Sequence, residues 1–447
     1  MLAAAWPLTA EAVSPVLLPT VIAFVVAAVV VIARPEYGLA AALVLAPFTN
    51  YRFGASSKPF HLLLPALVFG LLVYALLVPR RRVTTVSHWL AAAVVFLLAV
   101  GIASALNGLD ASGSVNKLFL LATAVGMFFA VRELATEPKH FAVVAGGAIT
   151  GLLLASLQGI YEHAKHKYGV AGFLADGHFV GRIQGSFGHP NQYGGYLVFL
   201  IPVAAAIVLT AAFSIRLRVL ALAAVAAAVP ALIFSYARGA IVALALGVLV
   251  WLGVMRPRWA LGLAAVFAAV AVLFAPATLK ERFSPQASSG DVPLRTDVWG
   301  AAIDIAQNHP WLGAGLGDFS DAYRRLPSTL SHASQRRLLN QSGLLVPPHA
   351  QNLYLNVLAE EGVLGVAALM LFAMGTVAVV YRGSRAREPT GRAICLGTGA
   401  GVVTVAFHSI LEVTLFTELS LPFFALVAVA LTVRALDRDD PAAAIEG

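Results

Sequence analysis

The sequence predicts an all-α, polytopic integral membrane protein with about 12 transmembrane helices. Hydrophobic residues make up 60% of the 447 residues and charged residues only 12%, whereas a soluble domain is typically about half apolar and a quarter charged. The mean hydropathy of +0.84 agrees with this bias. The apolar residues also form blocks of about 20 residues, the length with which a helix crosses a bilayer. These three observations define the fold class.

The apolar blocks predict the helices in chain order. The block at 37–50 is short for a span and is expected to enter the membrane only part-way, which leaves twelve full spans with both termini on one side. Thirteen spans, with the N-terminus on the other side, is the alternative. The first block follows no charged segment and no cleavage site, so it is expected to be a membrane helix. The predicted helices lie at 14–33, 37–50, 59–78, 88–106, 116–132, 140–160, 191–213, 217–236, 239–255, 258–276, 351–381, 391–411 and 416–434.

The distribution of lysine and arginine predicts the orientation, because short loops rich in these residues face the cytoplasm. By alternation, the short basic loops all fall on one side, which is therefore predicted to be cytoplasmic. The opposite side receives two long loops, 161–190 and 277–350, so the chain 1–447 is expected to be one transmembrane domain with two outer loops. The basic loops contain Arg80, Arg81, Arg82, Arg132, Lys139, Arg216, Arg218, Arg256, Arg258, Arg382, Arg385, Arg387 and Arg392.

The longer outer loop is predicted to contain helices of its own, since structureless loops of this length are uncommon in compact proteins. Thr296–Asn308 is expected to form an amphipathic helix on the membrane surface, with Trp299, Ile303 and Ala306 on its apolar face. Two further short helices are predicted at 319–326 and 331–339.

Several classes of protein are excluded by composition and spacing. The single cysteine, Cys395, lies in a membrane block, so neither an intrachain disulfide nor a thiolate metal cluster is expected. The net charge of +8 arises in short loops without interleaved aromatic residues, which argues against nucleic acid as a partner. His163, His166 and His178 lack a carboxylate or cysteine at a recognisable spacing, so no metal site is predicted. Gly313–Gly317 superficially resembles a nucleotide-binding loop, but no strand precedes it, and a turn is expected.

His349 is the first candidate for chemistry, because it follows two prolines at the start of a predicted helix. The positive end of the helix dipole disfavours an imidazolium, so a neutral ring able to accept a proton is expected there. Asn352, Asn356 and Glu360 continue as one polar stripe, and polar groups at membrane depth usually face a cavity or the bundle interior. The alternative is that His349 only caps the helix or pairs with a loop carboxylate.

Two arginines on outer turns are the next candidates. Arg238 lies in a tight turn between two apolar blocks, where a guanidinium is costly unless it meets an anion or water. Snorkelling to lipid headgroups is the alternative. Arg182 lies in a glycine-rich segment that ends at Pro190 and Asn191, where helix-start amides and a bidentate guanidinium can hold a phosphate. A turn-rich return to the membrane is the alternative there.

Three weaker candidates lie elsewhere in the outer segments. Arg295 is expected to contact lipid headgroups or a substrate phosphate. His408 and Glu412 are four residues apart near an outer helix end, and they are expected to pair with each other or with an arginine.

Four fragments in order resemble the O-antigen ligases, which belong to a wider ligase/polymerase family of polytopic envelope-glycan enzymes. Each fragment alone is weakly specific, but the four together, with a large outer loop before the final helices, are specific for the wider family. Ala350 departs from the pattern, since the family often has Asn or Ser directly after the histidine. The fragments are Arg182…Gly185-Ser186-Phe187…Pro190-Asn191, Ser235-Tyr236-Ala237-Arg238-Gly239-Ala240, Arg295…Trp299…His309-Pro310-Trp311-Leu312-Gly313-Ala314-Gly315, and His349-Ala350-Gln351-Asn352-Leu353-Tyr354-Leu355…Glu361-Gly362-Val363-Leu364-Gly365.

The resemblance implies a GT-C-like glycosyltransferase of the bacterial inner membrane, with its active site facing the periplasm. It implies transfer of O-antigen polysaccharide from undecaprenyl diphosphate to lipid A-core in lipopolysaccharide biosynthesis, in contact with membrane lipids. Arg182 and Arg238 are then expected to stabilise the diphosphate, and His349 to act as general base, in a metal-independent, inverting transfer without a cofactor. Contacts to substrate are expected from Arg295, Asn191, Gln351, Asn352 and Asn356.

Three other functions stay open. An O-antigen or exopolysaccharide polymerase would use the same donor, and so would a protein O-oligosaccharyltransferase, although those enzymes often carry further outer mass after the last helices. A lipid-glycan transporter would be expected to show inverted repeats or broken midplane helices with ionisable residues. In this sequence the polar features collect at the outer surface instead.

Overall fold

The structure is a computed structural model that describes residues 34–49, 59–78, 88–109, 111–169, 172–175, 178–255, 279, 291–326, 331, 334–336, 338–339, 346–415 and 417–439. It confirms an all-α, multi-pass membrane protein. Within these residues, nine helices are long and apolar enough to cross a membrane. The spans predicted at 14–33 and 258–276 lie outside the described residues.

The helices follow the predicted blocks closely, with ends that shift by a few residues. The elements are α2 (Pro35–Leu45), η1 (Ala46–Phe48), α3 (Pro59–Leu77), α4 (His88–Leu106), α5 (Ala111–Leu134), α6 (Pro138–Ala164), β1 (Gly172–Ala175), β2 (His178–Gly181), α7 (Pro190–Leu209), α8 (Ile215–Ser235), α9 (Arg238–Met255), α13 (Asp291–Asn308), α14 (Phe319–Arg324), α16 (Leu353–Gly383), α17 (Pro389–His408) and α18 (Ser420–Asp439).

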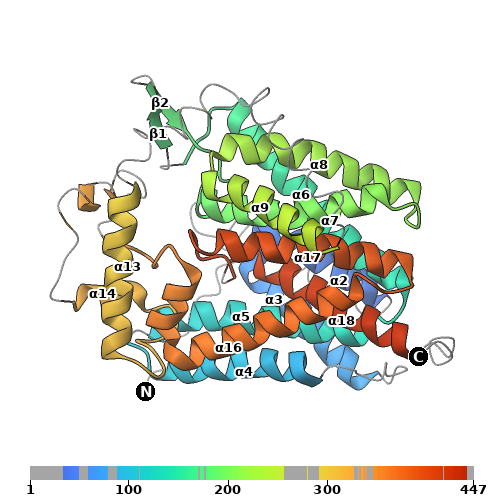
Figure 1. Cartoon of the computed structure of the whole chain (residues 1–447), viewed down its shortest axis with the longest axis horizontal. Helices are drawn as coiled ribbons and strands as arrows, with labels where there is room; N and C mark the ends of the chain where they lie inside the picture. Colours follow the sequence, from blue (N-terminus) through green and yellow to red (C-terminus); the bar gives the residue numbers. More distant parts are fainter. Residues whose placement is uncertain are drawn as a thin grey trace, which may run out of the picture.

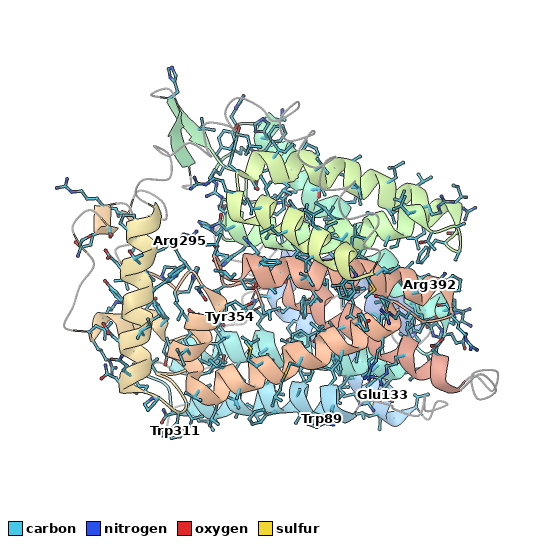
Figure 2. The ribbon with its side chains drawn as sticks, viewed as in Figure 1. Trp89, Glu133, Arg295, Trp311, Tyr354 and Arg392 are labelled. Atoms are coloured by element: carbon cyan, nitrogen blue, oxygen red, sulfur yellow. The ribbon has the colours of Figure 1, made fainter. Side chains whose placement is uncertain are left out.

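The long helices run side by side, and α13 and α14 lie across their ends (Figure 1). Helix α17 packs against α7 and α9, while α6 packs against α2 and α8, and α18 against α5. Leu76, Leu106 and Leu222 are 74%, 85% and 56% exposed, as expected for side chains that face lipid. We call the end that carries α13, α14 and the strands the loop end. Arg295 and Trp311 lie there, whereas Glu133 and Arg392 lie at the opposite end (Figure 2).

The block predicted to enter the membrane only part-way passes through much of the bundle. Helix α2 runs alongside α6, with Ala40 against Gly147 and Leu43 against Gly151. At its far end, the carbonyl of Pro47 accepts a hydrogen bond from Ser186, which belongs to a loop-end segment. Helix α2 and η1 together, Pro35–Phe48, are nevertheless shorter than the nine described helices that are long enough to cross a membrane.

Helix α16 is broken near the loop end. Gly362 has φ of 67° and ψ of −162°, which no helix contains. The turn at 313–317 fills the break: Ala314 and Gly315 donate backbone N–H groups to the carbonyls of Ala359 and Glu360, at 2.9 and 3.0 Å. The glycine-rich segment is therefore a turn, as predicted, and its role is to satisfy the backbone groups that the break leaves without helical partners.

The apolar face predicted for Thr296–Asn308 is wrong in part, since Ala306 is buried but Ile303 is not. The helix exists, but it begins at Asp291, and Ile303 is 44% exposed. It packs against α14 and α16 with a different stripe, in which every member is at least 98% buried. That stripe consists of Leu294, Val298, Ala302 and Ile305, at positions i, i+4, i+8 and i+11 of a helix.

The outer loop 161–190 contains a β-hairpin that the sequence did not predict. Strands β1 and β2 pair antiparallel, with Gly172 opposite Gly181 and Ala175 opposite His178. Each strand has only four residues, too few for a clear alternation of polar and apolar side chains. Of the two short helices predicted in the second loop, the first is α14. The described residues of the other, 334–336 and 338–339, are helical.

Gly362→Ala should destabilise the protein, because its backbone conformation is essentially restricted to glycine and an added Cβ would collide with the backbone of Trp311. The backbone strain alone should cost about 1–3 kcal/mol. Thermal unfolding of the purified protein in detergent measures the loss. Gly253→Ala in α9 is the matched control, since nothing lies within 4 Å of its added Cβ. Equal unfolding midpoints for the two variants would contradict the assigned break.

Candidate active site

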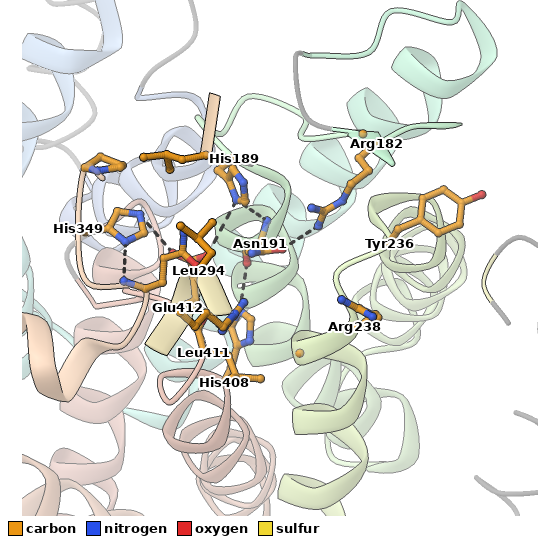
Figure 3. A pocket seen from close by; sticks show the side chains of 16 residues that line it. Arg182, His189, Asn191, Tyr236, Arg238, Leu294, His349, His408, Leu411 and Glu412 are labelled. Carbon is orange, nitrogen blue, oxygen red and sulfur yellow. Dashed lines mark hydrogen bonds and ion pairs between the residues drawn. The ribbon is translucent and has the colours of Figure 1, made fainter. Parts of the chain in front are cut away.

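A cavity of about 100 Å³ opens at the loop end, where α7, α9, α13 and α17 come together with the segment before α16. Its charged residues, among those that the structure describes, are three arginines and one glutamate. Figure 3 shows His349 on one side of Glu412 and Asn191, with Arg182 and Arg238 on the other. The polar side chains around the cavity are Arg182, His189, Asn191, Arg238, Arg295, His349, Gln351, His408 and Glu412.

The three arginines reach the cavity from different parts of the chain. Arg182 is only 6% exposed, and its Nε donates to the carbonyl of Ser235 at 2.8 Å. Arg238 begins α9, directly after a tight turn in which Tyr236 takes the left-handed conformation. Arg295 in α13 donates from Nη1 to the carbonyl of Leu411 at 3.0 Å. The sequence predictions for these arginines thus converge on one place.

Asn191 connects the arginine side of the cavity with the histidine side. Its Oδ1 accepts from Arg182 Nη2 at 2.7 Å, so its side-chain amide nitrogen is the group that donates to Glu412. Its backbone carbonyl accepts from His408 Nε2 at 3.1 Å. The backbone N–H, predicted to hold an anion, instead donates to His189 Nδ1 at 3.2 Å.

Glu412 is the buried anion of the site, with a side chain that is only 2% exposed. One carboxylate oxygen lies 3.4 Å from His349 Nε2, and the other lies 3.9 Å from His189 Nδ1. Burial alone would raise the pKa of Glu412, but His349, His189 and His408 and the bond from Asn191 oppose it and lower the pKa to about 2. The Val413 N–H also donates to the carboxylate, at 3.1 Å. The carboxylate is therefore ionised at neutral pH.

His349 is neutral at neutral pH, as predicted, but for a different main reason. Loss of solvation lowers its pKa; Glu412 opposes this, while Lys117 and Arg295 lower the pKa further. The ring lies in the segment before α16, which begins only at Leu353. Its Nδ1 accepts from the Gln351 N–H at 3.1 Å, so the neutral ring carries its proton on Nε2, toward Glu412.

His189 has a similar environment on the other side of the carboxylate. Loss of solvation is the main cause that lowers its pKa to about 4, with Glu412 opposing and Arg182 adding to the shift. The site thus holds an ionised carboxylate between two neutral imidazoles.

The remaining sequence candidates fall into two groups. Gln351 lines the cavity, with a positive φ of 51° that is unusual for a residue other than glycine. Asn352 and Asn356 do not line it: Asn352 caps α16 by accepting from Leu355 N–H, and Asn356 accepts from Ala350 N–H at 3.0 Å. They hold the loop that carries His349.

Sequence reasoning gave too little weight to Glu412, His189 and His408. Glu412 pairs with His349 and His189, whereas the sequence suggested His408 or an arginine as its partner. The available signal was a carboxylate in an apolar outer segment, because such a charge is rarely buried without partners.

Metal ligation has no support among the described residues, where no group of three His, Cys, Asp or Glu side chains could hold an ion. His163 stacks on Phe234, with ring centroids 3.8 Å apart, and His166 lies 3.4 Å from the Tyr168 hydroxyl. The stacking contact accounts for His163, whereas His166 and His178 are exposed. Cys395, the single cysteine of the sequence, is buried.

A comparison with protein families matches residues 222–370, about one third of the chain, to the family described as O-antigen ligase. The match covers Arg238, Arg295 and His349 and supports the resemblance of this part of the chain to the O-antigen ligase family. This family is associated with glycosyl transfer on polysaccharide and lipid substrates. No curated protein matches the chain.

Glu412→Gln should lower the pKa of His349 further, because it removes the negative charge that favours the imidazolium. NMR titration of histidines labelled at Cε1 measures this, with the His349 signal assigned by its loss in His349→Gln. An unchanged midpoint for His349 would contradict its contact with Glu412.

Proposed function

We propose that the protein is an O-antigen ligase of the bacterial inner membrane, which transfers O-antigen from undecaprenyl diphosphate to lipid A-core. The observation that carries this proposal is the convergence of Arg182, Arg238 and Arg295 with His349 around one cavity at the loop end. Three cations and one anion favour a negatively charged ligand, and a histidine at the same cavity supplies an acid–base group.

The active site is proposed to face the periplasm. The loop end carries the long segments, whereas the short loops with Arg132 and Lys139, Arg216 and Arg218, and Arg382 to Arg392 lie at the opposite end. Short basic loops favour the cytoplasmic side. The cavity then lies where the headgroup of a lipid-linked donor in the outer leaflet would be found.

The arginines are proposed to stabilise the leaving diphosphate. Arg182 is fixed by Ser235 and Asn191 before any substrate arrives, and Arg295 is fixed by Leu411. Charges held in place in this way need little reorganisation as negative charge develops on the leaving oxygen. Arg238, at the first turn of α9, adds a third positive charge. In other transferases a divalent metal stabilises the negative charge of the leaving diphosphate. Because the arginines can do this here, we propose a metal-independent reaction.

His349 is proposed to be the general base. The acceptor hydroxyl attacks the anomeric carbon of the donor sugar, the bond from that carbon to the phosphate oxygen breaks, and the diphosphate leaves with the electron pair. The proton of the acceptor hydroxyl passes to His349 Nδ1. For this transfer, the hydroxyl takes the place of the Gln351 N–H as the hydrogen-bond donor to Nδ1. The ionised Glu412 then stabilises the imidazolium through Nε2. A single displacement of this kind inverts the anomeric configuration.

His349→Ala should reduce ligation by about 10²–10⁴-fold through loss of the base. The assay uses full-length protein in detergent, undecaprenyl diphosphate-linked O-antigen and rough lipopolysaccharide as acceptor, with a chelator present. His178→Ala is the matched control and should keep its activity, because this histidine is exposed at the turn of the hairpin and does not line the cavity. Normal ligation by His349→Ala would refute the base assignment, and activity that returned only with Mg²⁺ would refute metal independence. If a lipid-linked chain replaced rough lipopolysaccharide as the better acceptor, the protein would be a polymerase.

Arg238→Ala and Arg182→Lys should each weaken binding of undecaprenyl diphosphate by about tenfold or more, the effect of losing one charge-assisted hydrogen bond. Lysine keeps the charge of Arg182 but lacks the planar fork that reaches Ser235 and Asn191 together. Binding is measured with the purified protein and a fluorescent analogue. Arg324→Ala, an exposed arginine paired with Asp321, is the control. Unchanged affinity in both test variants would exclude a diphosphate clamp.

A further inference from the structure

A second and larger cavity lies at the loop end, beside the outer turns of α3, α5 and α7. Its volume is about 360 Å³, within the range of about 300–1,000 Å³ that is usual for ligand sites. None of the residues assigned above to the reaction lines it. The polar residues that do are Thr49, His61, Asn116, Lys117, Gln192, Thr417 and Glu418.

The two cavities are neighbours. Gln192 lines the second cavity and directly follows Asn191, which lines the first. Thr417 and Glu418 belong to the same segment between α17 and α18 as Glu412. The charge of Lys117, in the wall of the second cavity, also acts on His349 and lowers its pKa. A ligand in the second cavity would therefore have one end close to the proposed base.

The lining of the second cavity suits an uncharged ligand rich in hydroxyl groups. It contains one cation and one anion, in contrast to the three arginines and one glutamate of the first cavity. The hydroxyls of Thr49 and Thr417 donate to the carbonyls of Ala46 and Thr414. Thr49 can therefore accept from a ligand, and Thr417, which also accepts from the Leu419 N–H, has one lone pair left for it.

Amide and imidazole groups complete this lining. Gln192 supplies both a donor and an acceptor from the first turns of α7. His61 Nδ1 is buried and has no hydrogen-bond partner among the described residues. A buried polar atom of this kind is costly unless a ligand or water satisfies it. Both groups therefore favour a polar occupant.

We propose that the second cavity binds a sugar ring of one of the two substrates, next to the carbon at which transfer occurs. The proposal rests on the proposed function, since it assigns the cavity to a glycan of the same reaction. The ring belongs either to the acceptor, which presents the attacking hydroxyl, or to the first sugar of the donor. Both sugars would be recognised through hydrogen bonds to their hydroxyl groups. Kinetic measurements distinguish an acceptor sugar from a donor sugar.

Gln192→Leu tests the proposal, because it keeps the approximate size of the side chain and removes its amide. Leu120→Phe is a second variant, which narrows the cavity without removing a polar group. Lys117 is avoided, since its charge also acts on the buried Glu360 and Glu361. Gln158→Leu is the matched control: this glutamine is half-buried on the neighbouring α6 and lines neither cavity.

For an acceptor sugar, KM for rough lipopolysaccharide should rise about tenfold in both variants, with KM for the donor unchanged. For a donor sugar, KM for the donor should rise instead, while affinity for sugar-free undecaprenyl diphosphate stays the same. Unchanged KM values for both substrates, in variants with the unfolding midpoint of the control, would overturn the proposal.

A direct binding measurement separates this proposal from the proposed function. If the unmodified protein transferred no O-antigen, the proposed function would fail, and the cavity would be tested with core oligosaccharide released from rough lipopolysaccharide. Weaker binding by Gln192→Leu than by Gln158→Leu would support a sugar site. Equal binding by the two variants, or none by the unmodified protein, would contradict it.

Discussion

The buried carboxylate of Glu412 is the constraint on which the loop end depends. An ionised group with a 2% exposed side chain is costly unless every neighbouring element brings it a partner. Asn191 comes from α7 and His349 from the segment before α16, and α13 fixes the same turn when Arg295 binds Leu411. Segments that are far apart in the chain must therefore assemble together, and the cavity is the space that remains between them.

The break in α16 is the second constraint, and it explains the polar stripe on this helix. Glu360 accepts from the Phe319 N–H and gives its carbonyl to the turn at 313–317, while Asn356 holds Ala350. The stripe thus faces the protein interior, one of the two environments expected for polar groups at membrane depth, and it meets backbone groups there. These bonds keep the loop that carries His349 in one conformation, so the stripe contributes to the site by positioning.

The sequence predicts the membrane helices well. Each apolar block must form a helix to satisfy its own backbone hydrogen bonds, so the block can be recognised from its own residues alone. The sequence also brings Arg182, Arg238, Arg295 and His349 to one side of the membrane, because topology needs only alternation. The buried face of α13 could not be predicted from its sequence, because the helix has two possible apolar stripes and the packing partner determines which one is buried. The pairing of Glu412 with His349 could not be predicted from the sequence either, because only the tertiary fold brings these two residues together.

The charges around His349 and His189 influence how easily these two histidines can be protonated. Loss of solvation is the main cause that lowers the pKa of both histidines, and nearby cations add to it: Lys117 and Arg295 at His349, and Arg182 and Arg295 at His189. Under the proposed function, a bound diphosphate would offset the arginine charges and make protonation of His349 less costly. Arg295, one of the arginines proposed to hold the donor, would thereby restrain the base until the donor is bound. Donor binding and proton transfer would then be coupled through charge.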